Sequence, residues 1–119
     1  MKTENPILDK SFKFSVRIVN LVKTLQKEKE FTLSNQLLRS GTSIGANINE
    51  AQAAQSKKDF ISKMSIAAKE ARETHYWINL LIETDYLSIN DTHVKLLVSQ
   101  SEELIKLLTS IIKTSQSNL

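Results

Sequence analysis

A stripe of polar side chains is the first candidate for chemistry in this sequence. Its members recur at steps of three and four residues, the spacing that places side chains on one helix face: Ser40, Ser43, Asn47 and Glu50. Asn47 and Glu50 with the more distant Glu73 could bind a small ligand or supply a catalytic carboxylate if a pocket buries them. The alternatives are a solvated face, a polar seam at a subunit contact, or an ion pair of a glutamate with Arg39 or Arg72.

The standard catalytic and metal-binding patterns are absent from the sequence. A di-iron site in a helical bundle needs Glu-x-x-His pairs, but the residues three before His75 and His93 are Arg72 and Asn90. The chain has no cysteine, which excludes a thiolate nucleophile and a zinc-thiolate site. No G-x-S-x-G elbow, P-loop or dinucleotide fingerprint occurs. We therefore expect no enzyme activity, catalytic residue, metal or cofactor, and we expect both histidines at the surface or its boundary.

Positive charge is concentrated at the start of the chain. The net charge is +3; residues 1–30 hold seven basic residues against four acidic ones, and the rest of the chain carries nine of each. The candidate phosphate contacts are Lys10, Lys13, Arg17, Lys27, Lys57 and Lys58. Most aromatic residues, Phe12 among them, fall on apolar stripes, so base stacking is not expected. The sequence predicts contact with the phosphate backbone of RNA or DNA, independent of base sequence, or binding to a nucleic-acid-handling partner protein.

Composition and hydrophobic spacing predict one all-α domain. A chain of 119 residues is long enough for one core, and two glycines and one proline are too few for the turns of a β protein. Apolar residues recur at helical steps in four segments, which predicts an antiparallel up-down-up-down four-helix bundle over residues 6–29, 32–55, 57–84 and 91–115. The expected caps are Asn5, Thr32, Ser56 and either Asn90 or Asp91. Without an apolar leader or a membrane-length run, we expect a cytoplasmic protein.

Two glycines fall inside the second expected helix, and the apolar spacing continues across both. Each costs roughly 1 kcal/mol relative to alanine, so a close approach of another backbone should offset that cost. We expect tight packing against the third helix, where Ala67 and Ala71 are also small, or against a neighbouring subunit; a kink or break near the glycines is the alternative. The residues expected at this packing or oligomer interface are Gly41, Ser43, Gly45, Asn47 and Glu50.

A longer motif resembles a known family. The segment SIGANINEA is followed by a basic pair before Asp-Phe, then by an Ile-Ala pair and a glutamate: Ser43, Ala46, Asn47, Ile48, Glu50, Ala51, Lys57, Lys58, Asp59, Phe60, Ile66, Ala67 and Glu73. This pattern resembles the four-helix-bundle proteins encoded in intervening sequences of bacterial 23S rRNA genes, which are similar to the accessory protein of diversity-generating retroelements. The resemblance implies a homo-oligomeric ring such as a pentamer and contact with nucleic acid. That family has no established activity.

Overall fold

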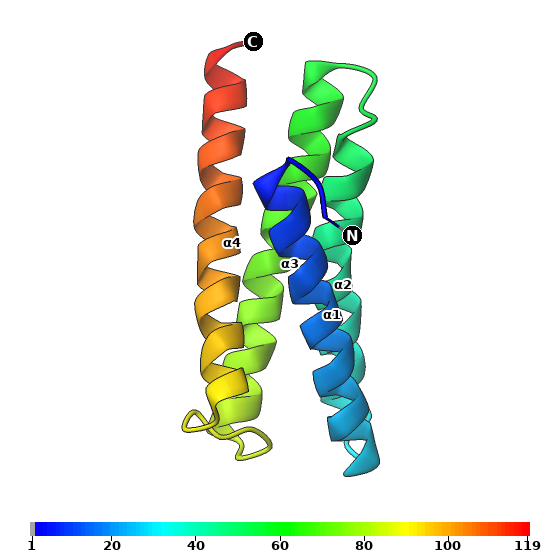
Figure 1. Cartoon of the computed structure of the whole chain (residues 1–119), viewed down its shortest axis with the longest axis vertical. Helices are drawn as coiled ribbons and strands as arrows, with labels where there is room; N and C mark the ends of the chain where they lie inside the picture. The colour runs from blue at the N-terminus through cyan, green and yellow to red at the C-terminus, as the bar shows by residue number, and fades with distance from the viewer. Residues whose placement is uncertain (1) are drawn as a thin grey trace.

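Residues 2–119, which the computed structural model describes, fold into four long α-helices joined by short turns (Figure 1). The helices are α1 (Pro6–Lys27), α2 (Thr32–Ala51), α3 (Lys57–Glu83) and α4 (Thr92–Ser117). Each helix packs on the next, and α1 also contacts α4, so the helices follow chain order around the bundle. Successive helices run in opposite directions. The predicted all-α four-helix bundle is confirmed.

Three of the four helices begin at the predicted caps. Asn5 Oδ1 accepts the Leu8 N–H at 3.4 Å, and Ser56 Oγ accepts the Asp59 N–H at 3.1 Å. Asp91, rather than Asn90, caps α4. These side chains satisfy backbone donors that the first helical turn leaves without a partner.

The start of α2 differs from the prediction. Thr32 is the first helical residue, and its side chain makes no capping bond. The Glu30 carboxylate instead accepts the backbone N–H groups of Leu33 and Ser34, both at 2.8 Å. A carboxylate here also places negative charge at the positive end of the helix dipole, which favours it over a hydroxyl.

Helices α1 and α2 end earlier than predicted, at Lys27 and Ala51 rather than at residues 29 and 55. After α1, Lys29 adopts a left-handed backbone conformation (φ 64°), and the Glu30 N–H bonds to the Leu25 carbonyl, a Schellman motif that closes the helix. After Ala51, the α2 backbone tightens into i→i+3 hydrogen bonds. The chain must then extend to place Ser56 as a cap, so the helix does not reach residue 55.

The core is a column of apolar side chains from all four helices. The largest fully buried ones are Phe14, Ile18, Leu25, Leu37, Ile44, Ile48, Met64, Ile78, Leu81, Leu104 and Leu108. Phe14 fills the α1 part of this column, whereas Phe12, expected on the apolar face, is 41% exposed. Residues 12 and 14 lie about 200° apart on a helix, so only one can face the core.

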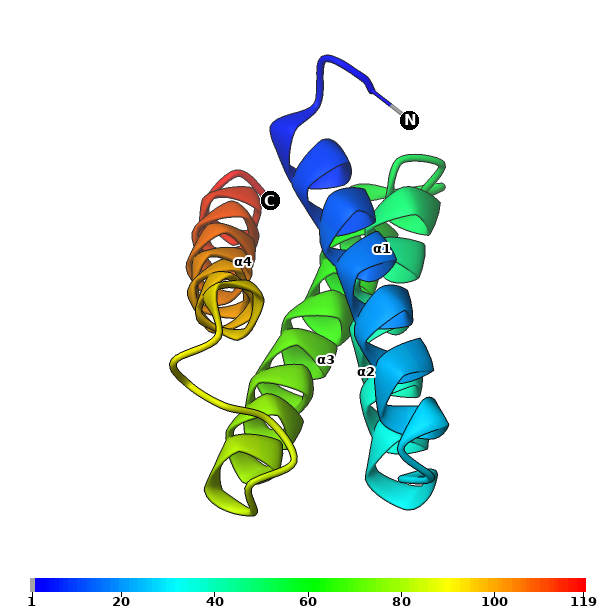
Figure 2. The same ribbon diagram turned by 60° about the horizontal axis from the view of Figure 1, so that its bottom comes forward.

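The helix α2 continues through both glycines, as predicted, but the helix that approaches the two glycines is α1 rather than α3. A Cβ atom at Gly41 would lie 2.8 Å from Ile18 Cγ2, and one at Gly45 would lie 3.1 Å from Ser15 Oγ and 3.3 Å from the Ser11 carbonyl oxygen. The small side chains of Ser11 and Ser15 let the two backbones approach. Figure 2 shows α1 lying along α2, while α4 lies farther from α1.

Candidate functional site

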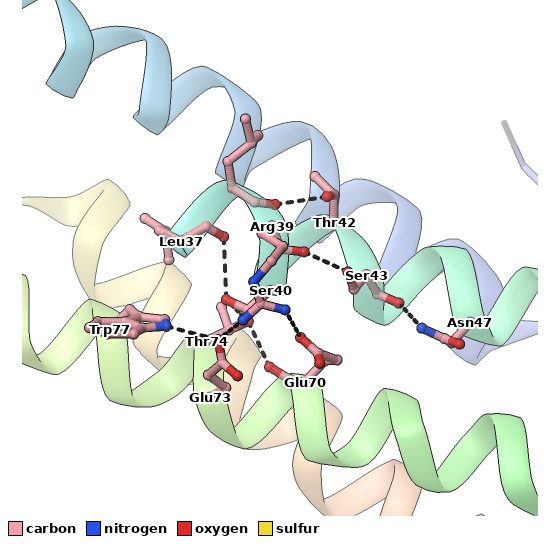
Figure 3. A network of polar contacts seen from close by, with 11 residues as sticks. Leu37, Arg39, Ser40, Thr42, Ser43, Asn47, Glu70, Glu73, Thr74 and Trp77 are labelled. Atoms are coloured by element: carbon pink, nitrogen blue, oxygen red, sulfur yellow. Dashed lines mark hydrogen bonds and ion pairs between the residues drawn. The ribbon is translucent and has the colours of Figure 1, made fainter. Parts of the chain in front are cut away.

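An ion-pair network joins α2 to α3 where the polar stripe was predicted (Figure 3). Arg39 Nη1 lies 3.2 Å from Glu70 Oε2, and Arg39 Nη2 bonds to Glu73 Oε2. Trp77 Nε1 donates to the same Glu73 oxygen at 3.0 Å. Of the alternatives left open by the sequence, the structure forms the ion pair of Glu73 with Arg39, and this glutamate already has two structural partners.

The members of the polar stripe do not converge on one site. Ser40 is fully buried, with its Oγ 3.0 Å from Thr74 Oγ1. Ser43 and Asn47 bond back to backbone carbonyls of α2 itself, and Glu50 is exposed. None of the three main surface hollows formed by residues 2–119 is lined by Asn47, Glu50 or Glu73. The small-ligand or catalytic hypothesis gains no support from this geometry.

The six predicted phosphate contacts lie in separate places. Lys10 pairs with Glu103 of α4 at 3.4 Å, and Lys57 Nζ donates to the Asn118 carbonyl at 3.3 Å. Arg17 is half-buried in a groove of about 490 Å³ between α1 and the start of α4. Lys13, Lys27 and Lys58 are exposed. Because Lys27 and Lys57 stand near opposite ends of the bundle, the structure does not form one patch from all six.

The outer side of α1 carries apolar side chains that the core does not use. Phe12 is 41% and Val16 46% exposed. Phe12 lines a shallow groove of about 360 Å³, and Val16 follows one helical turn later on α1. The lining comes from α1 and α2: Leu8, Ser11, Phe12, Ser15, Thr42, Gly45, Ala46 and Asn49. We call Phe12, Val16 and this groove the α1–α2 outer face.

Exposed aromatic rings contradict the expectation that most aromatics are on apolar stripes. Four of the seven are exposed: Phe12, Phe31, Tyr76 and Tyr86. The sequence prediction also missed Lys69 and Arg72, which lie on the same exposed face of α3 as Tyr76. The signal was present, because residues 69, 72 and 76 follow three- and four-residue steps opposite the buried repeat of α3.

A local charge pair sets the pKa values at the start of α3. Asp59 Oδ1 accepts a hydrogen bond from Lys63 Nζ at 2.7 Å, and Oδ2 accepts the Gln55 N–H at 3.2 Å. These bonds, the Lys63 bond first, lower the pKa of Asp59 below its ordinary value, and the same pair raises the pKa of Lys63. The carboxylate binds the N–H of Gln55, the residue before the Ser56 cap, and stabilises the helix start.

The histidines lie apart. His75 is half-buried on α3, with Nε2 4.0 Å from Glu102, and His93 is exposed near the start of α4. In the part of the chain that the structure describes, no three His, Asp or Glu side chains gather as metal ligands. Likewise, no described helix is long and apolar enough to cross a membrane.

The motif that begins at Ser43 agrees with a comparison to known families. The sequence matches, over residues 3–110, the family model described as 23S rRNA-intervening sequence protein. The chain belongs to this family. A crystal structure of a protein of unknown function from the S23 ribosomal protein family of Bacteroides thetaiotaomicron is 56% identical, covering 90% of this chain and 98% of that one, with a TM-score of 0.85. No curated protein matches the sequence. The predicted family resemblance is confirmed.

Proposed function

We propose that this member of the 23S rRNA-intervening sequence family is a non-enzymatic scaffold whose copies assemble and contact nucleic acid through its phosphates. The observation that carries the assembly is the α1–α2 outer face. Phe12 and Val16 are exposed at 41% and 46% on consecutive turns of one helix. Adjacent exposed apolar side chains beside a groove are typical of a protein–protein contact.

The expected occupant of this face is a second copy of the chain. The groove beside Phe12 and Val16 is lined by small residues, Gly45 and Ala46 among them, so apolar side chains of another copy can approach closely. The family resemblance favours closure into a ring, for which five copies are the expected number. Of the interface residues predicted from sequence, Gly45 is the one that lines this groove.

Two properties support nucleic acid as the partner. The chain has 16 Lys and Arg residues against 13 Asp and Glu, and an assembly multiplies that excess. The matched family is described as 23S rRNA-intervening sequence protein, and the structural relative comes from the S23 ribosomal protein family; both names support a role that involves nucleic acid. Exposed Lys13 and Lys58 are free to contact phosphates, whereas Lys10 is engaged with Glu103.

Light scattering at micromolar concentration tests the assembly. Wild type should give a multiple of 13.5 kDa. The pair Phe12→Lys with Val16→Lys should give a monomer, because two charges would be buried at the contact. Ile89→Lys is the matched control, since Ile89 is 46% exposed like Val16 but lies outside the α1–α2 outer face. A wild-type monomer at every concentration would contradict the assembly.

Filter binding tests the nucleic-acid part. A mixed RNA and a mixed single-stranded DNA should both be retained at low salt and released as salt rises, with little dependence on sequence. Retention of neither, by a folded and oligomeric protein, would assign the role to a protein partner instead.

A further inference from the structure

One face of α3 carries side chains that packing within the bundle does not use. Its members recur at steps of four and three residues, and all are exposed: Lys58, Ser62, Ser65, Lys69, Arg72 and Tyr76. We call this set the α3 track. It lies opposite the buried repeat of α3, which includes Met64, Ala71 and Ile78, and it follows about 27 Å of helix.

The α3 track carries charge of a single sign. Lys58, Lys69 and Arg72 belong to none of the ion pairs formed among residues 2–119. The acidic residue four positions after Lys69, Glu73, is already bound to Arg39 and Trp77. The solvent-facing side of α4 differs, because its exposed charges are of both signs: Lys95, Glu102, Glu103, Lys106 and Lys113. A row of cations that form no ion pairs attracts a polyanion, whereas a row of mixed sign is locally neutral.

An exposed aromatic ring ends the α3 track. Tyr76 is 59% exposed, one helical turn beyond Arg72. Its ring meets Trp77 edge-on, with centroids 5.2 Å apart and planes at 73°. This contact steadies the ring, and the high exposure leaves ring surface open to solvent. Cations that track a phosphate backbone, followed by an accessible aromatic ring, are the combination that single-stranded nucleic acid requires.

We propose that the α3 track binds single-stranded nucleic acid, with phosphates on Lys58, Lys69 and Arg72 and one base stacked on Tyr76. The inference rests on the proposed function and goes beyond it, because it names the surface and selects single strands over duplex. A paired base is stacked on its neighbours in a duplex and cannot offer its face to Tyr76. The helices α1 and α3 do not contact each other, so the α3 track and the exposed Phe12 and Val16 of α1 lie on separate helices of the bundle.

Fluorescence anisotropy of a short labelled RNA, single-stranded or as its duplex, tests the proposal. Wild type should bind the single strand more tightly than the duplex. Trp77 is the only tryptophan in the chain and contacts Tyr76, so its emission should change on binding. Tyr76→Ala should weaken single-strand binding at least about fivefold, and Tyr76→Phe should restore it, because stacking needs the ring and not the hydroxyl.

Charge variants distinguish binding at the α3 track from attraction by the overall positive charge of the protein. Lys69→Gln with Arg72→Gln should reduce the slope of log affinity against log salt by about 1.4, since each single-strand phosphate contact contributes about 0.7. Lys95→Gln with Lys106→Gln removes the same charge from the mixed face of α4 and should leave the slope nearly unchanged. Circular dichroism checks that each variant remains helical.

The outcomes distinguish failure of this proposal from failure of the proposed function. If wild type binds RNA but both charge pairs have equal effects and Tyr76→Ala binds normally, the α3 track is overturned while the scaffold role stands. If wild type binds no nucleic acid, the α3-track proposal and the nucleic-acid role of the proposed function are both contradicted. If polyglutamate binds the track as tightly as RNA does, the site belongs to an acidic protein partner, which also overturns the proposal.

Discussion

Helices α1 and α3 both pack on α2, but they do so through different chemistry. Against α1, Gly41 and Gly45 remove side chains so that the two backbones approach, and Ile18 lies against the gap. Against α3, the longer side chain of Arg39 reaches Glu70 and Glu73. The first contact should be sensitive to added volume and the second to a lost partner.

The outer faces of the same two helices also differ. The outer face of α1 exposes the apolar Phe12 and Val16 beside Lys23, while the α3 track exposes three cations and Tyr76. Both helices bury apolar side chains at steps of three and four residues. Packing in the core therefore does not determine which side chains their outer faces expose. The difference indicates two uses: contact between copies at α1 and contact with a polyanion at α3.

The largest effect is expected from added volume at the α1–α2 contact. Gly41→Leu should lower the free energy of unfolding by about 3 kcal/mol or more, because even a Cβ would lie 2.8 Å from the buried Ile18. Urea unfolding measures the change. Gln36→Leu, at an exposed position of the same helix, is the control and should stay within about 0.5 kcal/mol of wild type.

At Gly45 the outcome should depend on side-chain size. Gly45→Ala should be within about 1 kcal/mol of wild type, because the helix propensity gain offsets a mild contact with the Ser15 hydroxyl, which can rotate. Gly45→Leu should cost about 1–3 kcal/mol by overpacking. If thermal melts show that leucine is tolerated as well as alanine, the close-approach explanation is wrong at this position.

Loss of a partner at the α2–α3 contact should have a smaller effect. Arg39→Met should cost about 1–2 kcal/mol, because it leaves Glu70, only 8% exposed, without its counter-ion while half-exposed Arg39 contributes little by itself. Adding Glu70→Gln should recover part of that loss. A double-mutant cycle by chemical denaturation measures the coupling, and a cycle without coupling would contradict the bridge.

The smallest effect concerns acid sensitivity. The hydrogen bond from Lys63 holds the pKa of Asp59 below its ordinary value of 3.8. The folded state therefore gains stability above that value and loses it as the pH falls through the lowered pKa. Thermal melts should show wild type more stable than Asp59→Asn at neutral pH, with the difference disappearing in acid. Lys63→Met should weaken the same acid dependence, and an unchanged pH profile in that variant would contradict the assignment.

Much of the fold could be predicted from the sequence because helical periodicity is local. The apolar repeat through Gly41 and Gly45 indicated an uninterrupted helix, and Asn5 and Ser56 fixed two helix starts. The neighbour of the glycines could not be predicted, because α1 and α3 both carry small residues and only tertiary packing selects between them. The cap of α2 was missed because Glu30 acts from before the helix start.

The candidate surfaces were harder to predict than the core. Counting charges favoured α1, but Lys10 is paired across the bundle with Glu103, a contact between residues far apart in sequence. Phe12 was assigned to the apolar face because it lies near the edge of a broad stripe, where exposure depends on how closely α2 approaches. The three- and four-residue spacing of Lys69, Arg72 and Tyr76 is present in the sequence. The net charge of residues 31–119 is zero, so a sum over that segment does not show that these residues share one helix face.

The central claim is that the outer face of α1 joins copies of the chain while the α3 track stays open for nucleic acid. The mobility of a spin label attached to each of these two faces tests both parts of the claim. The chain has no cysteine, so Lys23→Cys, seven residues beyond Val16 on the α1 face, and Ser65→Cys, on the α3 track, each give one labelling site. At micromolar protein the electron paramagnetic resonance spectrum should show an immobile label at position 23 that becomes mobile on dilution. The label at position 65 should remain mobile until single-stranded RNA is added. Labels that are mobile at both positions under every condition would contradict the account.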